Sequence, residues 1–221
     1  MVLLGIASAQ PLVLPHWSGS FDWEGQSYSY TLIGASPAQG SSTTNIPVNV
    51  IPVRVLFSDG SVFDPMDPFL GSTALDFALH SPIFQPTSWT AGSVDLGSTQ
   101  FGDAIQRANF WNYVSTGAPD YHGLLNQPKI LSPVLLTPPP QSGLTVSENG
   151  ALRGILDYGW LRQNISSMGG MLDPASLTIF LVKQVSSAPS IQNPSSYDCS
   201  FHSSLSQGQC GCDLHVRKHL R

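Results

Sequence analysis

The chain has 221 residues, a formal net charge of −5 and 10% charged residues, where about 25% is typical of globular domains. A phosphate-binding surface needs clustered Lys and Arg, so this balance argues against a nucleic-acid partner. No apolar run reaches the roughly 18 residues of a membrane-spanning helix, so we expect no membrane partner. With 20 Gly and 18 Pro, the composition is typical of strands and loops rather than of a helical bundle.

The first nine residues have the pattern that ends a signal peptide. Residues 2–6 are apolar, and Ala7-Ser8-Ala9 fits the small-x-small pattern that signal peptidase cuts. We therefore expect residues 1–9 to be a signal-peptide remnant and the protein to be secreted, either extracellular or periplasmic. The alternative is an ordinary apolar N-terminal arm, because the segment lacks a basic region.

Strand patterns come before the main helix. Residues 16–34 alternate aromatic and polar side chains around Glu24-Gly25-Gln26, which predicts a hairpin. Residues 46–57 predict the best strand, with a break or bulge at Ile51-Pro52, because proline cannot donate to a ladder. After the helix, residues 177–185 form a β-branched and aromatic run of strand length.

The clearest helix is predicted for Thr99–Val114. Its apolar positions follow a 3.6-residue period, so one apolar stripe is expected to pack against a sheet. The stripe consists of Phe101, Ala104, Ile105, Ala108 and Trp111. Ser98 or Thr99 is expected to cap the helix, and Asp103 is expected to interact with the positive end of its dipole.

The element order is strands, helix, strands, without regular βαβ alternation. It predicts an α+β fold in which a mixed or antiparallel sheet is backed by the one main helix. A β-sandwich with a decorating helix is the alternative. We expect a single domain over residues 10–204, incomplete at its C-terminal end, and a non-native or disordered tail over residues 205–221, where the composition shifts.

The tail gathers the candidate metal ligands. Cys210, Cys212, His215 and His219 offer the four donors that zinc prefers. On a helix the two histidines would share a face, but Val216 stands where a His-Glu-x-x-His motif has its general base. A structural zinc site is therefore weighed against a disordered basic tail, and no catalytic residue is assigned.

Four rings of the predicted hairpin form a candidate contact surface. Trp17, Trp23, Tyr28 and Tyr30 either provide a stacking platform for sugars or peptides or fill one end of the core. Among the isolated histidines, His122 follows the expected helix end and is expected to cap it or to pair locally.

Two further motifs have ordinary explanations. Asp59, Asp64 and Asp67 lie close in sequence, as calcium ligands do, but the spacing is not that of an EF-hand and the neighbouring prolines favour a plain turn. Asn164-Ile165-Ser166 is a formal glycosylation sequon.

Several segments together resemble an uncharacterised family of secreted bacterial proteins. The likeness covers roughly residues 17–204, and TQFGDAIQRANFW is its most specific part. The matching segments are WSGSFDWEGQSYSYTLIG, TTNIPVNVIPVRVLFSDGSVFD, SPIFQ, TQFGDAIQRANFW and LTIFLVKQV. Longer members continue into a helix of His-Glu-x-x-Glu-Trp type, which is similar to the active helix of zincin metallopeptidases.

The resemblance implies a zincin-like N-terminal part. The chain would then be a secreted metallopeptidase-related domain that lacks its catalytic helix and is inactive as given. Zinc would bind only a full-length form, because no position here matches the family's zinc ligands or general base. The alternative is a non-catalytic extracellular binding or adhesion module, whose aromatic surface contacts a peptide or polysaccharide.

Overall fold

A computed structural model describes residues 14–169 and 172–192. The chain divides into two compact units. The first comprises residues up to 49, 76–129 and 173–179, and the second comprises residues 50–75, 130–172 and those from 180 onward. The predicted signal-peptide remnant (residues 1–9) and tail (residues 205–221) lie outside the described residues, so both stay predictions.

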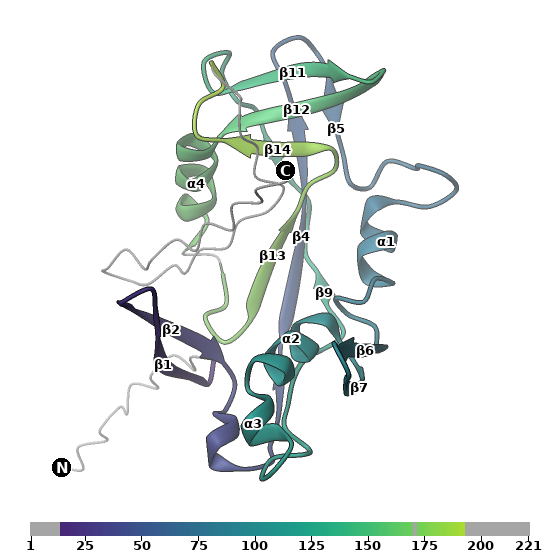
Figure 1. Cartoon of the computed structure of the whole chain (residues 1–221). Coiled ribbons are helices and arrows are strands. Elements are labelled where there is room, and N and C mark those ends of the chain that lie inside the picture. Colours follow the sequence, from purple (N-terminus) through teal and green to yellow (C-terminus); the bar gives the residue numbers. More distant parts are fainter. Residues whose placement is uncertain (1–13, 170–171, 193–221) are drawn as a thin grey trace, which may run out of the picture. The chain divides into compact units, whose positions relative to one another are not determined.

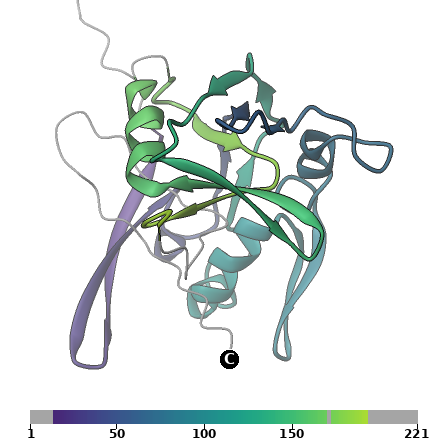
Figure 2. The same cartoon turned by 90° about the horizontal axis from the view of Figure 1, so that it is seen from above.

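The first unit is built from short strand pairs and two helices (Figure 1). β1 and β2 form an antiparallel hairpin, which Figure 2 shows in purple as a two-stranded arm. β6 and β7 also pair antiparallel, whereas β3 and β8 pair parallel. Its elements are β1 (His16–Trp23), β2 (Gln26–Ile33), η1 (Pro37–Gln39), β3 (Thr43–Ile46), β6 (Thr87–Ala91), β7 (Val94–Thr99), α2 (Phe101–Asn109), α3 (Trp111–Val114) and β8 (His122–Leu125).

The second unit has a mixed sheet and a three-stranded sheet with one helix. In the mixed sheet β4 pairs parallel with β10 and antiparallel with β5. In the other sheet β12 pairs antiparallel with β11 and parallel with β14. Its elements are β5 (Val62–Phe63), β10 (Val134–Leu136), β11 (Gly143–Glu148), β12 (Ala151–Asp157), α4 (Tyr158–Ser167) and β14 (Val185–Ala188). The elements that cross from one unit into the other are β4 (Val48–Leu56), α1 (Ala74–Leu79), β9 (Lys129–Ile130) and β13 (Leu177–Leu181).

The core of the second unit collects apolar side chains from β4, β5, β10, β12, α4 and β14. β4 is buried on both faces, which explains why its sequence is a nearly continuous apolar run. Gly154 lets β12 approach closely, because a Cβ atom there would lie 2.6 Å from the Phe57 ring. The buried cluster consists of Ile51, Val53, Val55, Phe57, Phe63, Leu136, Leu156, Leu161 and Val185.

The best predicted strand divides at a different proline from the one expected. β3 ends before Pro47 and β4 begins after it, whereas Pro52 lies inside β4. Pro52 is tolerated because the neighbouring strands bond to other residues. Leu131 N donates to Val50 O, and the pairing with β10 begins at Val53.

The predicted strand over residues 177–185 is two strands. β13 ends at Leu181 and β14 begins at Val185. Between them Gln184 has φ 54°, in the left-handed region, so the chain turns before it pairs with β12. The apolar pattern predicted the strands correctly but carried no signal for this turn.

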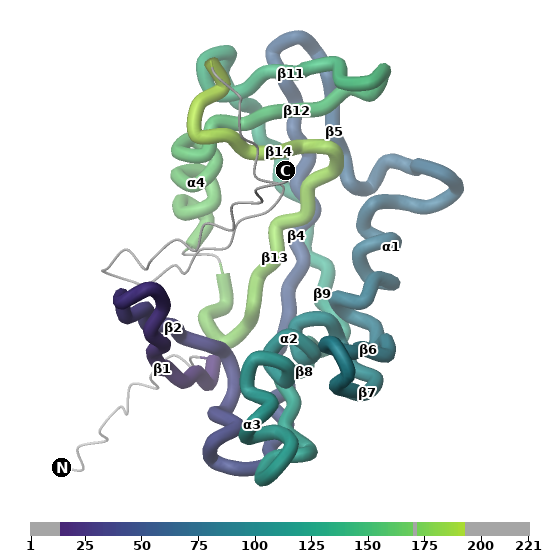
Figure 3. The backbone as a smooth tube through the Cα atoms, in the orientation of Figure 1, coloured from purple at the N-terminus to yellow at the C-terminus, as the bar shows by residue number. Residues whose placement is uncertain are grey.

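The predicted helix over Thr99–Val114 is divided as well. α2 ends at Asn109, the chain turns at Phe110, and α3 follows as a separate coil (Figure 3). Neither predicted cap is used, because Gln100 occupies the N-cap position without a side-chain bond and Thr99 belongs to β7.

The predicted apolar stripe is buried only in part. Of its members, Ala104 is buried, Ala108 and Trp111 are half-buried, and Phe101 and Ile105 are each 45% exposed. The polar residues Asp103 and Arg107 are buried beside Ala104. The helix also faces its neighbours through polar side chains that bond to their backbone, so hydrophobic periodicity indicated only part of the buried face.

The coarse class predicted from the sequence is confirmed. The described residues form a mixed α+β structure, mostly strands in small open sheets with a few short helices. Within residues 14–169 and 172–192, no helix is both long and apolar enough to cross a membrane. The zincin-like arrangement stays a prediction.

Candidate functional site

The β1–β2 hairpin separates aromatic from polar side chains. Its strands pair without a break from His16↔Ile33 to Trp23↔Gln26, and directly opposed residues share a face of the ribbon. The two-residue turn Glu24-Gly25 has φ values of 48° and 76°, as a type I′ hairpin turn requires. One face of the ribbon, called here the aromatic face, therefore carries Trp17, Phe21, Trp23, Tyr28 and Tyr30, and the opposite face carries Ser18, Ser20, Asp22, Ser27, Ser29 and Thr31.

The base of the aromatic face is fixed to the end of α2. Trp17 meets Tyr30 edge-on with ring centroids 5.5 Å apart, and Phe110 lies 5.0 Å from Trp17 and 5.9 Å from Tyr30. Tyr30 also covers Gly19, where a Cβ atom would lie 2.6 Å from its ring carbon. Because Phe110 sits at the turn between α2 and α3, the break in the helix supplies the ring that anchors the hairpin.

The tip of the aromatic face, Phe21, Trp23 and Tyr28, is open to solvent. These side chains are 53%, 62% and 42% exposed. Phe21 and Tyr28 stack across the strands with centroids 5.5 Å apart and planes at 21°, and the Tyr28 hydroxyl donates to Gln26 Oε1 over 2.9 Å. The base of the aromatic face therefore packs against α2, as one alternative expected, whereas the tip is exposed and its use as a stacking platform stays a prediction.

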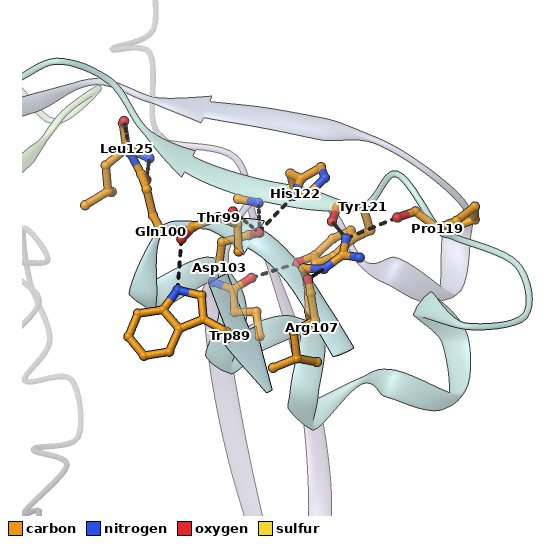
Figure 4. Close-up of polar contacts among 12 residues, drawn as sticks. Trp89, Thr99, Gln100, Asp103, Arg107, Pro119, Tyr121, His122 and Leu125 are labelled. Atoms are coloured by element: carbon orange, nitrogen blue, oxygen red, sulfur yellow. Dashed lines mark hydrogen bonds and ion pairs between the residues drawn. The ribbon is translucent and has the colours of Figure 1, made fainter. Parts of the chain in front are cut away.

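A buried polar network centred on Asp103 holds α2 in place (Figure 4). The Asp103 side chain is fully buried and accepts three hydrogen bonds, from Thr99 Oγ1 (2.7 Å), His122 Nδ1 (2.8 Å) and Gly123 N (2.7 Å). A carboxylate only accepts, so the His122 proton lies on Nδ1. The expected local role of His122 is thus replaced by a bond to a residue 19 positions earlier.

Arg107 extends the network one turn further along α2. Its guanidinium is buried and donates to three backbone carbonyls, those of Leu96 (3.2 Å), Pro119 (3.1 Å) and Tyr121 (2.6 Å). Arg107 therefore joins β7 and the loop before β8 to the same helix.

Two glutamines complete the polar face of α2. Gln100 donates to the carbonyls of Phe84 and Leu125 and accepts from Leu125 N (2.7 Å). Gln106 accepts from the Tyr121 hydroxyl over 2.8 Å. Burial and the nearby negative charge of Asp103 raise the pKa of Tyr121, so the phenol stays a neutral donor.

The network resembles catalytic machinery in one respect only. A buried carboxylate that orients an imidazole prepares the other ring nitrogen to accept a proton, and the His122 side chain is 29% exposed. In the part of the chain that the structure describes, however, no serine, threonine or cysteine is hydrogen-bonded to His122. We assign the network a structural role because Gln100, Asp103 and Arg107 bond to the backbone of the neighbouring segments.

The zinc ligands predicted in the tail and the described residues are considered in turn. Cys210, Cys212, His215 and His219 all lie outside the described residues, so the zinc site stays a prediction. Within residues 14–169 and 172–192, no group of three or more His, Cys, Asp or Glu side chains is placed to hold a metal ion.

Two of the three aspartates weighed as calcium ligands, Asp59 and Asp64, make separate contacts. Asp59 accepts from the Thr145 hydroxyl and from Ser61 N, and these bonds lower its pKa. Asp64 lies 3.8 Å from Arg54 Nε. The backbone bonds that Asp59 accepts from Ser61 N and Asp64 accepts from Met66 N are typical of turns, as the flanking prolines indicated.

A shallow hollow of about 240 Å³ lies beside β5 in the second unit, lined in part by Asp64, Asp67, Lys183 and Gln184. The Lys183 ammonium donates to the Asp67 carbonyl (3.3 Å) and lies 5.7 Å from the Phe69 ring centroid. Its cation is thus engaged within the protein, and we assign no ligand to the hollow.

Comparison with known protein families, with curated proteins and with solved structures finds no match to this chain.

Proposed function

We propose that the protein is a secreted binding module that contacts its ligand through the tip of the aromatic face. One observation carries the proposal: Phe21, Trp23 and Tyr28 project together from a hairpin whose base is anchored, and each is at least 42% exposed. Secretion is part of the proposal and comes from the N-terminal sequence pattern alone.

The geometry favours binding over a purely structural role for these rings. Large aromatic side chains dominate binding energies because they bring much contact area with little conformational entropy to lose. Here the stacking of Phe21 on Tyr28 and the bond from Tyr28 to Gln26 restrict the rings before any ligand arrives. A preformed, exposed aromatic group is an expected feature of a contact surface.

The experiment compares two double variants of the full chain. W23A/Y28A removes two rings of the tip, and S20A/S29A changes two hydroxyl groups on the opposite face of the same strands. Both are tested against immobilised polysaccharides, immobilised peptides and phospholipid vesicles, after circular dichroism shows that each is folded. Saturable binding that W23A/Y28A loses and S20A/S29A keeps supports the proposal. Equal binding by both variants, or no binding by the unchanged protein, refutes it.

The metallopeptidase relationship remains a separate proposal that rests on the sequence resemblance. No contact among the described residues supports it, and the family's helix would follow residue 204. Translating the gene downstream in all three frames tests it, because a His-Glu-containing helix within about 60 codons would favour this proposal over a binding module.

A further inference from the structure

We infer that the tip of the aromatic face binds a neutral polysaccharide chain, an inference that rests on the proposed function. The charge of the hairpin disfavours anionic ligands. Residues 16–33 include no Lys or Arg, and the acidic residues Asp22 and Glu24 flank Trp23 in the sequence. Nucleic acids, anionic lipid surfaces and sulfated polysaccharides all need cations at the contact. The tip would repel them.

The exposed area of the tip is small. Aromatic side chains bury 150–250 Å² each, so three that are about half exposed offer roughly 300 Å². A stable protein–protein interface needs about 800 Å² from each partner, more than twice this area. The tip is therefore too small to hold a folded protein by itself, but it is large enough for a few sugar rings.

The tip combines chemical groups that match those of a sugar ring. One face of a pyranose ring presents C–H groups that stack on aromatic rings, and its rim carries hydroxyl groups that donate and accept hydrogen bonds. Trp23 is 62% exposed and makes no ring contact with another aromatic side chain of the described residues, so its face is available for stacking. Glu24 follows Trp23 in the chain and is exposed, so a carboxylate that can accept from sugar hydroxyls is part of the tip. Because Gln26 uses its carbonyl to hold Tyr28, its amide N–H groups remain to donate.

The arrangement also fits an extended chain. Phe21 and Trp23 are two residues apart on one strand and share a face, which places them roughly 7 Å apart along β1. Successive sugar units of one polymer can therefore contact successive rings. An isolated monosaccharide would contact one ring only and bind more weakly.

The test uses pairs of polymers that share a backbone and differ in charge. The full chain is run in native affinity gels that contain hydroxyethylcellulose or carboxymethylcellulose, and dextran or dextran sulfate. We expect at least one neutral polymer to slow the protein and its anionic derivative to do so much less. The affinity calculated from the retardation should fall about tenfold or more for Trp23→Ala. It should fall less for Trp23→Phe and stay unchanged for S20A/S29A.

The outcomes separate the inference from the proposed function. Equal or stronger binding to the anionic polymers, or binding only to peptides or vesicles that Trp23→Ala abolishes, overturns the ligand class and leaves the tip as a contact surface. If no probe binds in a way that depends on Trp23, both the inference and the proposed function fail. Comparison of the melting curves of Trp23→Ala and the unchanged protein excludes loss of binding through unfolding.

Discussion

Replacing Asp103 with asparagine tests whether the buried network holds the first unit together. The carboxylate accepts through both oxygens, from Thr99 and His122 at Oδ2 and from Gly123 N at Oδ1. Asparagine has one accepting oxygen and keeps the shape of the side chain. If that oxygen takes the Oδ2 position, the new NH₂ group faces the N–H of Gly123, and two donors oppose each other in a buried site.

The cost follows from the number and type of bonds. A hydrogen bond to a charged group contributes about 1.5–3 kcal/mol, and an unsatisfied buried donor costs about 1–3 kcal/mol. Losing one charge-assisted bond and weakening two others therefore lowers the free energy of unfolding by about 3 kcal/mol. For a chain of this length that corresponds to a decrease of about 6–12 °C in melting temperature.

The assay is thermal unfolding followed by circular dichroism at neutral pH. Asp120→Asn is the matched control, because it makes the same charge change at an exposed side chain close to the network in sequence. We expect the control to melt within about 2 °C of the unchanged protein. If Asp103→Asn melts as the control does, the network does not stabilise the fold, and the structural role assigned to it is wrong.

Three further predictions concern individual side chains. Gly154→Ala should lower the free energy of unfolding by about 1–3 kcal/mol, because its methyl group would overlap the Phe57 ring, whereas a methyl group at Gly102 in α2 meets nothing within 4 Å, so Gly102→Ala should raise it by about 0.5–1 kcal/mol. Denaturant unfolding measures both changes, and a change of the same sign for both variants would contradict the close packing of Gly154 on Phe57. Tyr121 has a pKa raised above its ordinary value of 10.0, so the stability that its neutral phenol contributes is complete below pH 10 and is lost as the pH rises further. Tyr121→Phe should therefore be less stable than the unchanged protein by about 1 kcal/mol at pH 7 and should lose less stability above pH 10. Parallel curves of stability against pH for the two proteins would refute this. Thr145→Val should move the lowered pKa of Asp59 back toward its ordinary value of 3.8, as measured by carboxyl NMR titration, and an unchanged pKa would show that the hydroxyl is not its cause.

The hairpin was predictable because its determinants are local. Alternation of aromatic and polar residues sets the two faces, and Glu24-Gly25 adopts the positive φ angles that a two-residue turn needs. The division of the aromatic face was not predictable, because which rings pack depends on Phe110, about 85 positions after the hairpin turn.

The buried face of α2 shows where periodicity misleads. An apolar stripe predicts burial only when the helix packs on apolar neighbours, and here the polar residues Gln100, Asp103, Gln106 and Arg107 face inward, toward the backbone and side chains of other segments. Their spacing of 3, 3 and 1 residues also follows a helical face. In a chain with so few charges, an Asp and an Arg one turn apart were a signal that this face has a specific role.

The tip of the aromatic face is tested most directly by the indole N–H signals in a ¹H–¹⁵N NMR spectrum. The chain has 5 tryptophans, so the signals are few and can be assigned by substituting each in turn. As a soluble neutral oligosaccharide is added, we predict a saturable shift of the Trp23 signal, with the signal of Trp17 at the packed base shifting much less. If Trp23 does not respond while the oligosaccharide binds elsewhere, or if Trp17 shifts as far as Trp23, the exposed tip is not the contact surface.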